Sequence, residues 1–286
     1  MNRRRFLRQS GAAVAAGAVL GPGAARALAA ARAAGVPAEL GIQLYSLREV
    51  LGGDVNGTLD VLRRLGYRQV ETAGTADRTP VAFGAALAAH GLSAPSGHTS
   101  FDALVDDADA DAVFEAARAV GQQYVVIAWL NEEVRPDRAS YGAVAERINA
   151  IGERARAAGL TLGYHNHAFE FETFGTDRPA YFDFVEALDP ALVVMELDLY
   201  WTVVAGHDPV EIFHRYPGRF PLWHLKDGAG PEMDQTDVGA GGVDFPRIFA
   251  ASETAGLVHA FIEADNPAAP LAFAEASIAY VESLRE

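Results

Sequence analysis

The sequence predicts an α/β protein, a single (β/α)8 TIM barrel, and three observations support this. Short apolar runs alternate with amphipathic stretches in eight successive pairs after residue 39. Polar residues follow most of the apolar runs along the whole chain, and no Gly-x-Gly-x-x-Gly turn follows the first one. Repeated βα units form a parallel sheet, and eight units without a dinucleotide-binding turn favour a closed barrel over an open, doubly wound sheet.

The expected strands are short, mostly apolar runs bounded by Gly, Pro or Asp. They cover residues 41–45, 69–72, 92–96, 124–128, 160–165, 193–198, 221–225 and 260–263. The expected helices between them cover residues 58–65, 80–90, 109–120, 141–158, 180–188, 209–215, 245–255 and 270–284. Gly66, Gly91, Gly121, Gly159 and Gly256 each separate a helix from the next strand, where a left-handed C-cap is needed.

Length and composition limit the classes of function. A chain of 286 residues, half of them apolar, can bury one sizeable core, so we expect one domain over residues 39–286. The formal net charge of −15 disfavours nucleic-acid binding, which depends on Lys and Arg neutralising phosphates. There is no cysteine, so the sequence excludes disulfides, thiolate metal sites and a Cys nucleophile.

The first 29 residues have the order of a twin-arginine export signal. A pair of Arg, one further residue, Phe6-Leu7 and the basic Arg8 precede a modest apolar run and the Ala27-Leu28-Ala29 cleavage pattern. The alternatives are a basic amphipathic tail or an uncleaved anchor, although the apolar run is too short to span a bilayer. We expect removal of residues 1–29, a flexible stretch to about residue 38, and a periplasmic protein without a membrane segment.

The carboxyl ends of barrel strands face one shared mouth, so the residues there are candidates for the functional site. These are Gln43, Tyr45, Glu71, His98, Trp129, His165, His167, Glu196, Asp198, His224, Lys226, Glu263 and Asp265. A barrel interior cannot hold several carboxylates without a cation to offset the cost of burying them. The combination therefore points to a metal site, although each residue alone is equally consistent with a packing or capping role.

Alternation along the strands selects the metal ligands. Asp198, His224 and Glu263 fall on the inward register of three consecutive strands, and His165 ends the strand before them. Between Glu196 and Asp198, which share a face, Asp198 lies closer to the mouth. Two imidazoles and two carboxylates form a set suited to Mn²⁺, Zn²⁺, Co²⁺ or Mg²⁺.

With these residues placed, the sequence resembles the sugar phosphate isomerase/epimerase group with the xylose-isomerase-like barrel. The matching segments are Gly41-Ile42-Gln43-Leu44-Tyr45-Ser46, Gly66-Tyr67-Arg68-Gln69-Val70-Glu71, Ser96-Gly97-His98, Tyr164-His165-Asn166-His167, Met195-Glu196-Leu197-Asp198, His224-Leu225-Lys226-Asp227, residues 238–245 and Phe261-Ile262-Glu263. The resemblance implies a divalent metal held by residues from strands five to eight. It also implies a Glu on strand five, where this chain has His165, with Glu170 nearby as a replacement.

The chemistry implied by the resemblance is removal of a proton beside a carbonyl of a keto-sugar. We assign Glu263 as the base and Glu170 or His165 as the second acid/base. Lys226 either binds a hydroxyl or developing oxyanion, or forms a salt bridge to Asp227 or Glu196. The expected contacts to substrate hydroxyls or rings come from Tyr45, Glu71, His98, Asn166, His167 and Trp201.

Several alternatives stay open. Two-base epimerisation needs a second metal-bound carboxylate. Single-base isomerisation or a β-elimination of 3-keto-glycosides is therefore also consistent with these residues. The elimination would follow the action of a sugar oxidoreductase partner. A non-catalytic periplasmic sugar-binding protein is an alternative of another class, and a homo-oligomer is left open. The Gly-rich stretch 228–242 contains three acidic residues and no Lys or Arg, which favours a mobile lid over an unphosphorylated sugar.

Overall fold

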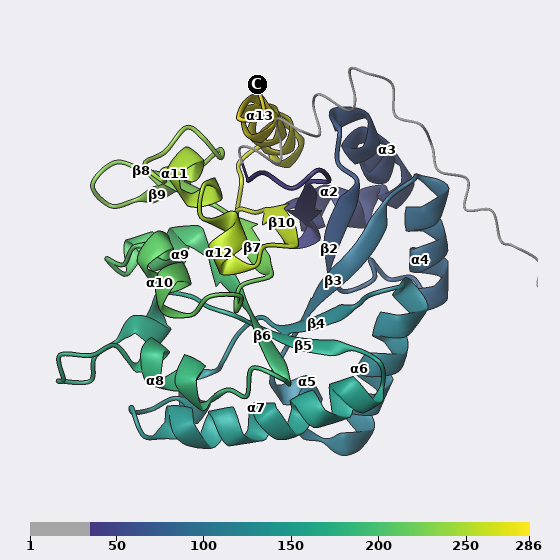
Figure 1. Cartoon of the computed structure of the whole chain (residues 1–286). Helices are drawn as coiled ribbons and strands as arrows, with labels where there is room; N and C mark the ends of the chain where they lie inside the picture. The colour runs from purple at the N-terminus through teal and green to yellow at the C-terminus, as the bar shows by residue number, and fades with distance from the viewer. Residues whose placement is uncertain (1–34) are drawn as a thin grey trace, which may run out of the picture.

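The computed structural model describes residues 35–286 and confirms the predicted barrel (Figure 1). Eight parallel strands close into a ring in the order β1-β10-β7-β6-β5-β4-β3-β2, so that β1 pairs with both β2 and β10. The strands are β1 (Gly41–Gln43), β2 (Gln69–Ala73), β3 (Ser93–Thr99), β4 (Tyr124–Ile127), β5 (Thr161–His165), β6 (Val193–Asp198), β7 (Leu222–Leu225) and β10 (His259–Ile262). The predicted export signal lies outside the described residues.

Helices surround the strands on the outside, as Figure 1 shows. The longer ones are α3 (Val55–Leu65), α4 (Pro80–Ala89), α6 (Asp107–Val120), α7 (Ser140–Ala157), α8 (Ala180–Ala187), α10 (Pro209–Arg215) and α13 (Pro270–Ser283). Short helices are η1 (Leu44–Leu47), α2 (Arg48–Gly53), α5 (Asp102–Val105), η2 (Glu132–Val134), η3 (Phe169–Phe171), α9 (Leu199–Val204), α11 (Phe245–Phe249) and α12 (Ser252–Ala255). Among residues 35–286, no helix is both long and apolar enough to cross a bilayer.

The predicted glycine caps are confirmed. All five glycines have positive φ, for example +116° at Gly66 and +99° at Gly121, a conformation in which a Cβ would be strained. Each glycine lets the chain leave its helix and turn back toward the barrel. The same local device thus ends five of the helices before a strand.

Some element boundaries differ from those predicted. The first strand ends at Gln43 because its side-chain oxygen accepts a 3.0 Å hydrogen bond from the Tyr45 backbone N–H, which starts the turn of η1. Strand β3 runs on to Thr99, so His98 lies within the strand instead of after it. The predicted helix over 245–255 is divided into α11 and α12.

The stretch predicted as a lid contains a small antiparallel hairpin, β8 (Asp227–Ala229) paired with β9 (Asp234–Thr236). The buried carboxylate of Asp227 anchors it. This carboxylate accepts hydrogen bonds of 2.9 to 3.0 Å from the backbone N–H groups of Gly228, Gly239, Gly241 and Val243. The base of the loop is therefore fixed to the end of β7.

An apolar floor closes the barrel beneath the site. Val126, Leu222 and Phe261 are fully buried and pack together, although β4 is not adjacent to β7 or β10 in the sheet. Side chains on non-adjacent strands can meet in this way only inside the barrel. The polar residues of the same strands therefore form a separate layer above an apolar one.

Candidate functional site

The mouth of the barrel holds a cavity of about 460 Å³. The predicted site residues that line it are Tyr45, His98, His165, His167, Trp201, His224, Lys226 and Glu263. Strand register brings a further predicted ligand, Asp198, next to one of these residues. Asp198 on β6 lies opposite His224 on β7, and adjacent parallel strands are only about 4.8 Å apart. The predicted site residues at the strand ends therefore lie close together in the structure.

Three of the predicted metal ligands, His165, Asp198 and His224, offer donor atoms within 4.8 Å of one another. Asp198 Oδ2 lies 3.4 Å from His165 Nε2 and 4.0 Å from His224 Nδ1. Glu263 Oε2 lies 3.7 Å from His224 Nδ1. Ligand atoms about 2.1 Å from one shared ion are separated by roughly 3 to 4 Å, so these distances suit a common cation.

The donor atoms of this group are also free for a ligand. His165 Nε2, Asp198 Oδ2 and His224 Nδ1 are buried and have no hydrogen-bond partner among the described residues. Burial, together with the nearby His224, lowers the pKa of His165, so its imidazole is neutral and keeps a lone pair. Unpaired buried polar atoms are costly, and an ion would satisfy these atoms together. The residues present therefore fit a divalent cation.

The opposite nitrogen of His224 faces a second group of carboxylates. His224 Nε2 lies 2.6 Å from Glu71 Oε2 and 3.3 Å from Glu196 Oε2. A carboxylate that accepts the Nε2 proton fixes the ring orientation and leaves Nδ1 as the ligand atom, as outer partners of metal-bound histidines do. Gln43 Nε2 donates to Glu71 at 2.9 Å, and the Ser96 hydroxyl donates to its other oxygen. Glu71 is therefore held below the cavity, where it orients His224 rather than contacts a substrate.

Lys226 lies at the edge of the candidate metal site. Its ammonium contacts Glu263 Oε2 and lies 2.8 Å from Asp265 Oδ1 and 3.5 Å from Asp198 Oδ2. Burial alone would lower the pKa of Lys226, but these three carboxylates outweigh it and raise the pKa. Lys226 therefore stays protonated and can donate a hydrogen bond or a proton. Its ion-pair partners are neither Asp227 nor Glu196.

Comparisons with known proteins agree with this architecture. The family model for the xylose isomerase-like TIM barrel matches residues 59–282. The chain belongs to the xylose isomerase-like TIM barrel family. A crystal structure of a sugar phosphate isomerase/epimerase from Parabacteroides distasonis has a TM-score of 0.74 with this chain. It is 26% identical, and the alignment covers 86% of this chain and 93% of that one.

Two further similar proteins have names other than isomerase or epimerase. An inosose dehydratase of Lacticaseibacillus casei is 28% identical over 131 residues, which cover 40% of this chain and only 43% of the relative. The IOLI protein, whose crystal structure holds a zinc atom, has a TM-score of 0.68 at 15% identity, with coverage of 86% and 96%, and shows the fold alone. Family members are thus sugar isomerases, epimerases and dehydratases, and the family supports an enzyme of this kind.

In this xylose isomerase-like barrel, the partly buried His98 pairs with the buried Glu196 next to His224. His98 Nε2 lies 2.7 Å from Glu196 Oε2, and the His98 ring stacks on that of His224 at 5.1 Å. Burial and the charge of Glu71 raise the pKa of Glu196 to about 7, against the opposing effect of the two histidines. The sequence placed Glu196 on the inward face but gave no reason to prefer it to Asp198 as a site residue. Its role in holding His98 depends on the position of β3 across the barrel.

Two other predicted site residues point into the protein. The Asn166 carboxamide oxygen accepts a 3.1 Å hydrogen bond from the Asp198 backbone N–H, so Asn166 positions the end of β6. Glu170 in η3 accepts hydrogen bonds from the Tyr164 hydroxyl at 2.7 Å and from the His167 backbone N–H at 2.8 Å. Neither side chain lines the cavity. Because both of its carboxylate oxygens already accept hydrogen bonds, Glu170 is badly placed to replace a strand-five ligand or to act as a second acid/base.

Aromatic side chains form the rim of the cavity. Tyr45 and Trp129 are 45% and 44% exposed, which is unusual for rings of this size. The His167 ring stacks on Phe169 and meets Trp129 edge-on. Burial lowers the pKa of His167 to about 2, so its ring is neutral and cannot act as an acid at neutral pH. Such a rim suits the flat apolar face of a sugar ring.

Replacing Asp198 by Asn tests the metal site. Asn keeps the oxygen that caps α9 by accepting from the Trp201 N–H at 2.8 Å, and replaces the ligand oxygen by an NH2 group that cannot bind a cation. We expect wild type to bind one equivalent of Zn²⁺ in calorimetric titration. Asp198→Asn should weaken binding by on the order of 100-fold or more, since even outer partners of a ligand contribute 10- to 100-fold. Exposed Asp234→Asn is the control, and equal affinity of all three proteins would contradict the site.

Replacing Glu170 by Gln should change how stability depends on pH. Burial raises the pKa of Glu170 to about 8 from an ordinary 4.5, despite the opposing hydrogen bonds from Tyr164 and His167. A carboxyl whose pKa is higher in the folded state is stabilising at low pH and loses that contribution as pH rises through 8. Relative to the variant, wild type should lose about 1 kcal/mol of unfolding free energy per pH unit between pH 5 and 8. Unfolding free energies can be measured for both proteins by urea denaturation. If they changed with pH in parallel over this range, the raised pKa of Glu170 would be disproved.

Proposed function

We propose that this chain is a metal-dependent enzyme of the sugar isomerase/epimerase type that removes a proton beside the carbonyl of a keto-sugar. The observation that carries the proposal is the group of unpaired donor atoms on His165, Asp198 and His224, directly beside Glu263 and Lys226. A sugar-binding protein without catalysis would have no use for such a group. The aromatic rim supports a carbohydrate as the substrate.

His165, Asp198, His224 and Glu263 would hold the ion, which is Mn²⁺, Zn²⁺, Co²⁺ or Mg²⁺ by the nature of its ligands. When bound, a divalent ion supplies Lewis-acid polarisation of the substrate carbonyl. The zinc atom of the IOLI protein supports a metal in a barrel of this fold. Glu71 contributes by keeping His224 in the tautomer that presents Nδ1.

Glu263 is the proposed base. Burial would raise its pKa, but the opposing effects, of which the charge of Lys226 is the largest, lower the pKa, so the carboxyl is ionised and can accept a proton. Lys226 is held protonated next to it and is the proposed hydrogen-bond or proton donor to the substrate oxygen. A base and an acid on adjacent strand ends are sufficient for transfer of a proton between neighbouring carbons.

A second candidate is β-elimination, as in a dehydratase or a 3-keto-glycoside lyase. Glu170 lies outside the cavity, which argues against Glu170 as the second base of a two-base epimerisation. After proton removal by Glu263, the ammonium of Lys226 could donate a proton to a departing hydroxyl or alkoxide. The inosose dehydratase relative supports this candidate.

Deuterium exchange tests the proposed function. Metal-loaded wild type in D₂O should introduce carbon-bound deuterium into 3-keto-glucose beside the carbonyl, observed by NMR. Glu263→Gln should slow this exchange by about 10² to 10⁴, because it removes the base. Glu275→Gln, at an exposed position of α13, should match wild type. Exchange at the wild-type rate in Glu263→Gln would refute the assignment of the base.

We also propose export by the twin-arginine route and action on a keto-sugar supplied by a sugar oxidoreductase, with a homo-oligomer left open. The basis is the motif at residues 3–8 and the need for a keto group at the start of the reaction. Cell fractionation tests the export. Replacing Arg3 and Arg4 together by Lys should leave the protein in the cytoplasm, whereas unchanged periplasmic recovery would count against this route.

A further inference from the structure

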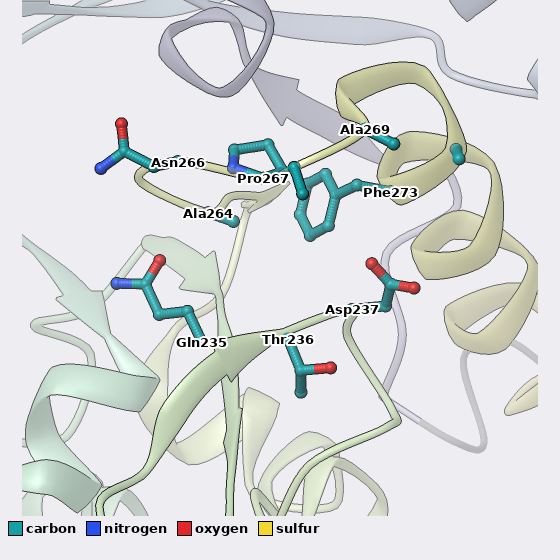
Figure 2. Close-up of a pocket in the computed structure, with 10 residues that line it drawn as sticks. Gln235, Thr236, Asp237, Ala264, Asn266, Pro267, Ala269 and Phe273 are labelled. Atoms are coloured by element: carbon teal, nitrogen blue, oxygen red, sulfur yellow. The ribbon is translucent and has the colours of Figure 1, made fainter.

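A second cavity of about 370 Å³ lies beside the catalytic one. It is a partly open cavity between the hairpin β8–β9 and the chain that leads from β10 into α13, as Figure 2 shows. Thr236 and Asp237 lie on one side, and Pro267 and Phe273 on the other. Asn266 lines this cavity and the catalytic cavity alike, so the two spaces are immediate neighbours.

One side-chain pair separates the two cavities. Asp265 Oδ1 accepts from Lys226 on the catalytic side, at 2.8 Å. Its other carboxylate oxygen accepts from the Gln235 carboxamide on the hairpin side, and the Asp265 backbone N–H donates to Gln235 Oε1 at 2.8 Å. The proposed proton donor and the hairpin are thus joined through Asp265. A molecule that extends over this pair would contact both cavities.

The charges around the second cavity exclude an anionic occupant. Its lining contains the carboxylate of Asp237 and no Lys or Arg. Arg48 lies near the shared rim, but its guanidinium already donates to the Asp265 carbonyl at 2.7 Å and to the Asn266 side-chain oxygen. Lys226 is matched by three carboxylates. A phosphate group would therefore meet negative charge without a free cation.

The remaining surface is suited to a neutral ring. Pro267, Phe273 and alanines give it an apolar face, while Gln235, Thr236 and Asp237 supply hydrogen-bonding groups. Polar and apolar groups thus contribute about equally to the lining, so the cavity offers a small molecule both a packing face and hydrogen bonds. The volumes of the two cavities lie at the lower end of the range of roughly 300 to 1,000 Å³ for such sites, so each suits a single ring.

We propose that the second cavity binds the substituent at the anomeric carbon of a neutral glycoside, while the keto-sugar ring occupies the catalytic cavity. This inference rests on the proposed function and narrows its substrate class from keto-sugars in general to keto-glycosides. The hairpin then acts as a specificity element, and Asp265 connects it to Lys226.

Ala272→Trp tests the inference, because this exposed residue of α13 lines the second cavity but not the catalytic one. The probes are 3-keto-glucose and its phenyl glycoside, with deuterium incorporation measured against substrate concentration. Wild type should have the lower KM for the glycoside. The variant should raise that KM about tenfold or more, equivalent to 1.4 kcal/mol, and leave the KM for 3-keto-glucose unchanged. Ala276→Trp, one turn further along α13 and outside both cavities, should match wild type.

The outcomes separate the two proposals. Equal kcat/KM for the two sugars in wild type, or an equal effect of Ala272→Trp on both, overturns the second cavity as a binding site and leaves the proposed function intact. Absence of deuterium exchange with either sugar overturns the proposed function, and the inference falls with it.

Discussion

The structure depends on how the four buried carboxyl groups around His224 are compensated. Glu71, Glu196 and Asp198 are fully buried, and Glu263 is nearly so. The desolvation penalty is several kcal/mol for each isolated charge, so the barrel interior must supply cations and hydrogen-bond donors. The histidines and Lys226 at the strand ends supply part of this compensation. The remaining unpaired atoms on His165, Asp198 and His224 would be satisfied by the proposed divalent ion.

His224 connects the two halves of this arrangement. Its Nε2 faces the deep carboxylates of Glu71 and Glu196, and its Nδ1 faces Asp198 and Glu263 nearer the mouth. Glu71 and Glu196 therefore set the orientation and tautomer of the His224 ring. With its Nδ1 free, this ring would bind the proposed metal ion together with Asp198 and Glu263. Asp227 and Asp265 act in the same way further out, because each fixes part of the loop after β7 by hydrogen bonds to residues that follow a barrel strand.

Local patterns in the sequence were sufficient to predict the fold and the inward-facing site residues. Repeated glycine stops and alternating apolar runs predicted the closed barrel, and period-two alternation placed Asp198, His224 and Glu263 on the inward face. Glu170 shows the limit of such reasoning. It follows His165 closely in sequence and has the right chemistry, but the turn of η3 directs its carboxylate to Tyr164 and away from the cavity.

The sequence by itself determined which side chains stand at the carboxyl ends of the strands, since strand periodicity and helix caps are properties of neighbouring residues. Only the tertiary structure decided which partners they meet. The pairing of Glu196 with His98 and of Gln235 with Asp265, and the second cavity beside them, join segments far apart in the chain. Such contacts depend on strand register and on the course of the loops after the strands, which no local pattern encodes.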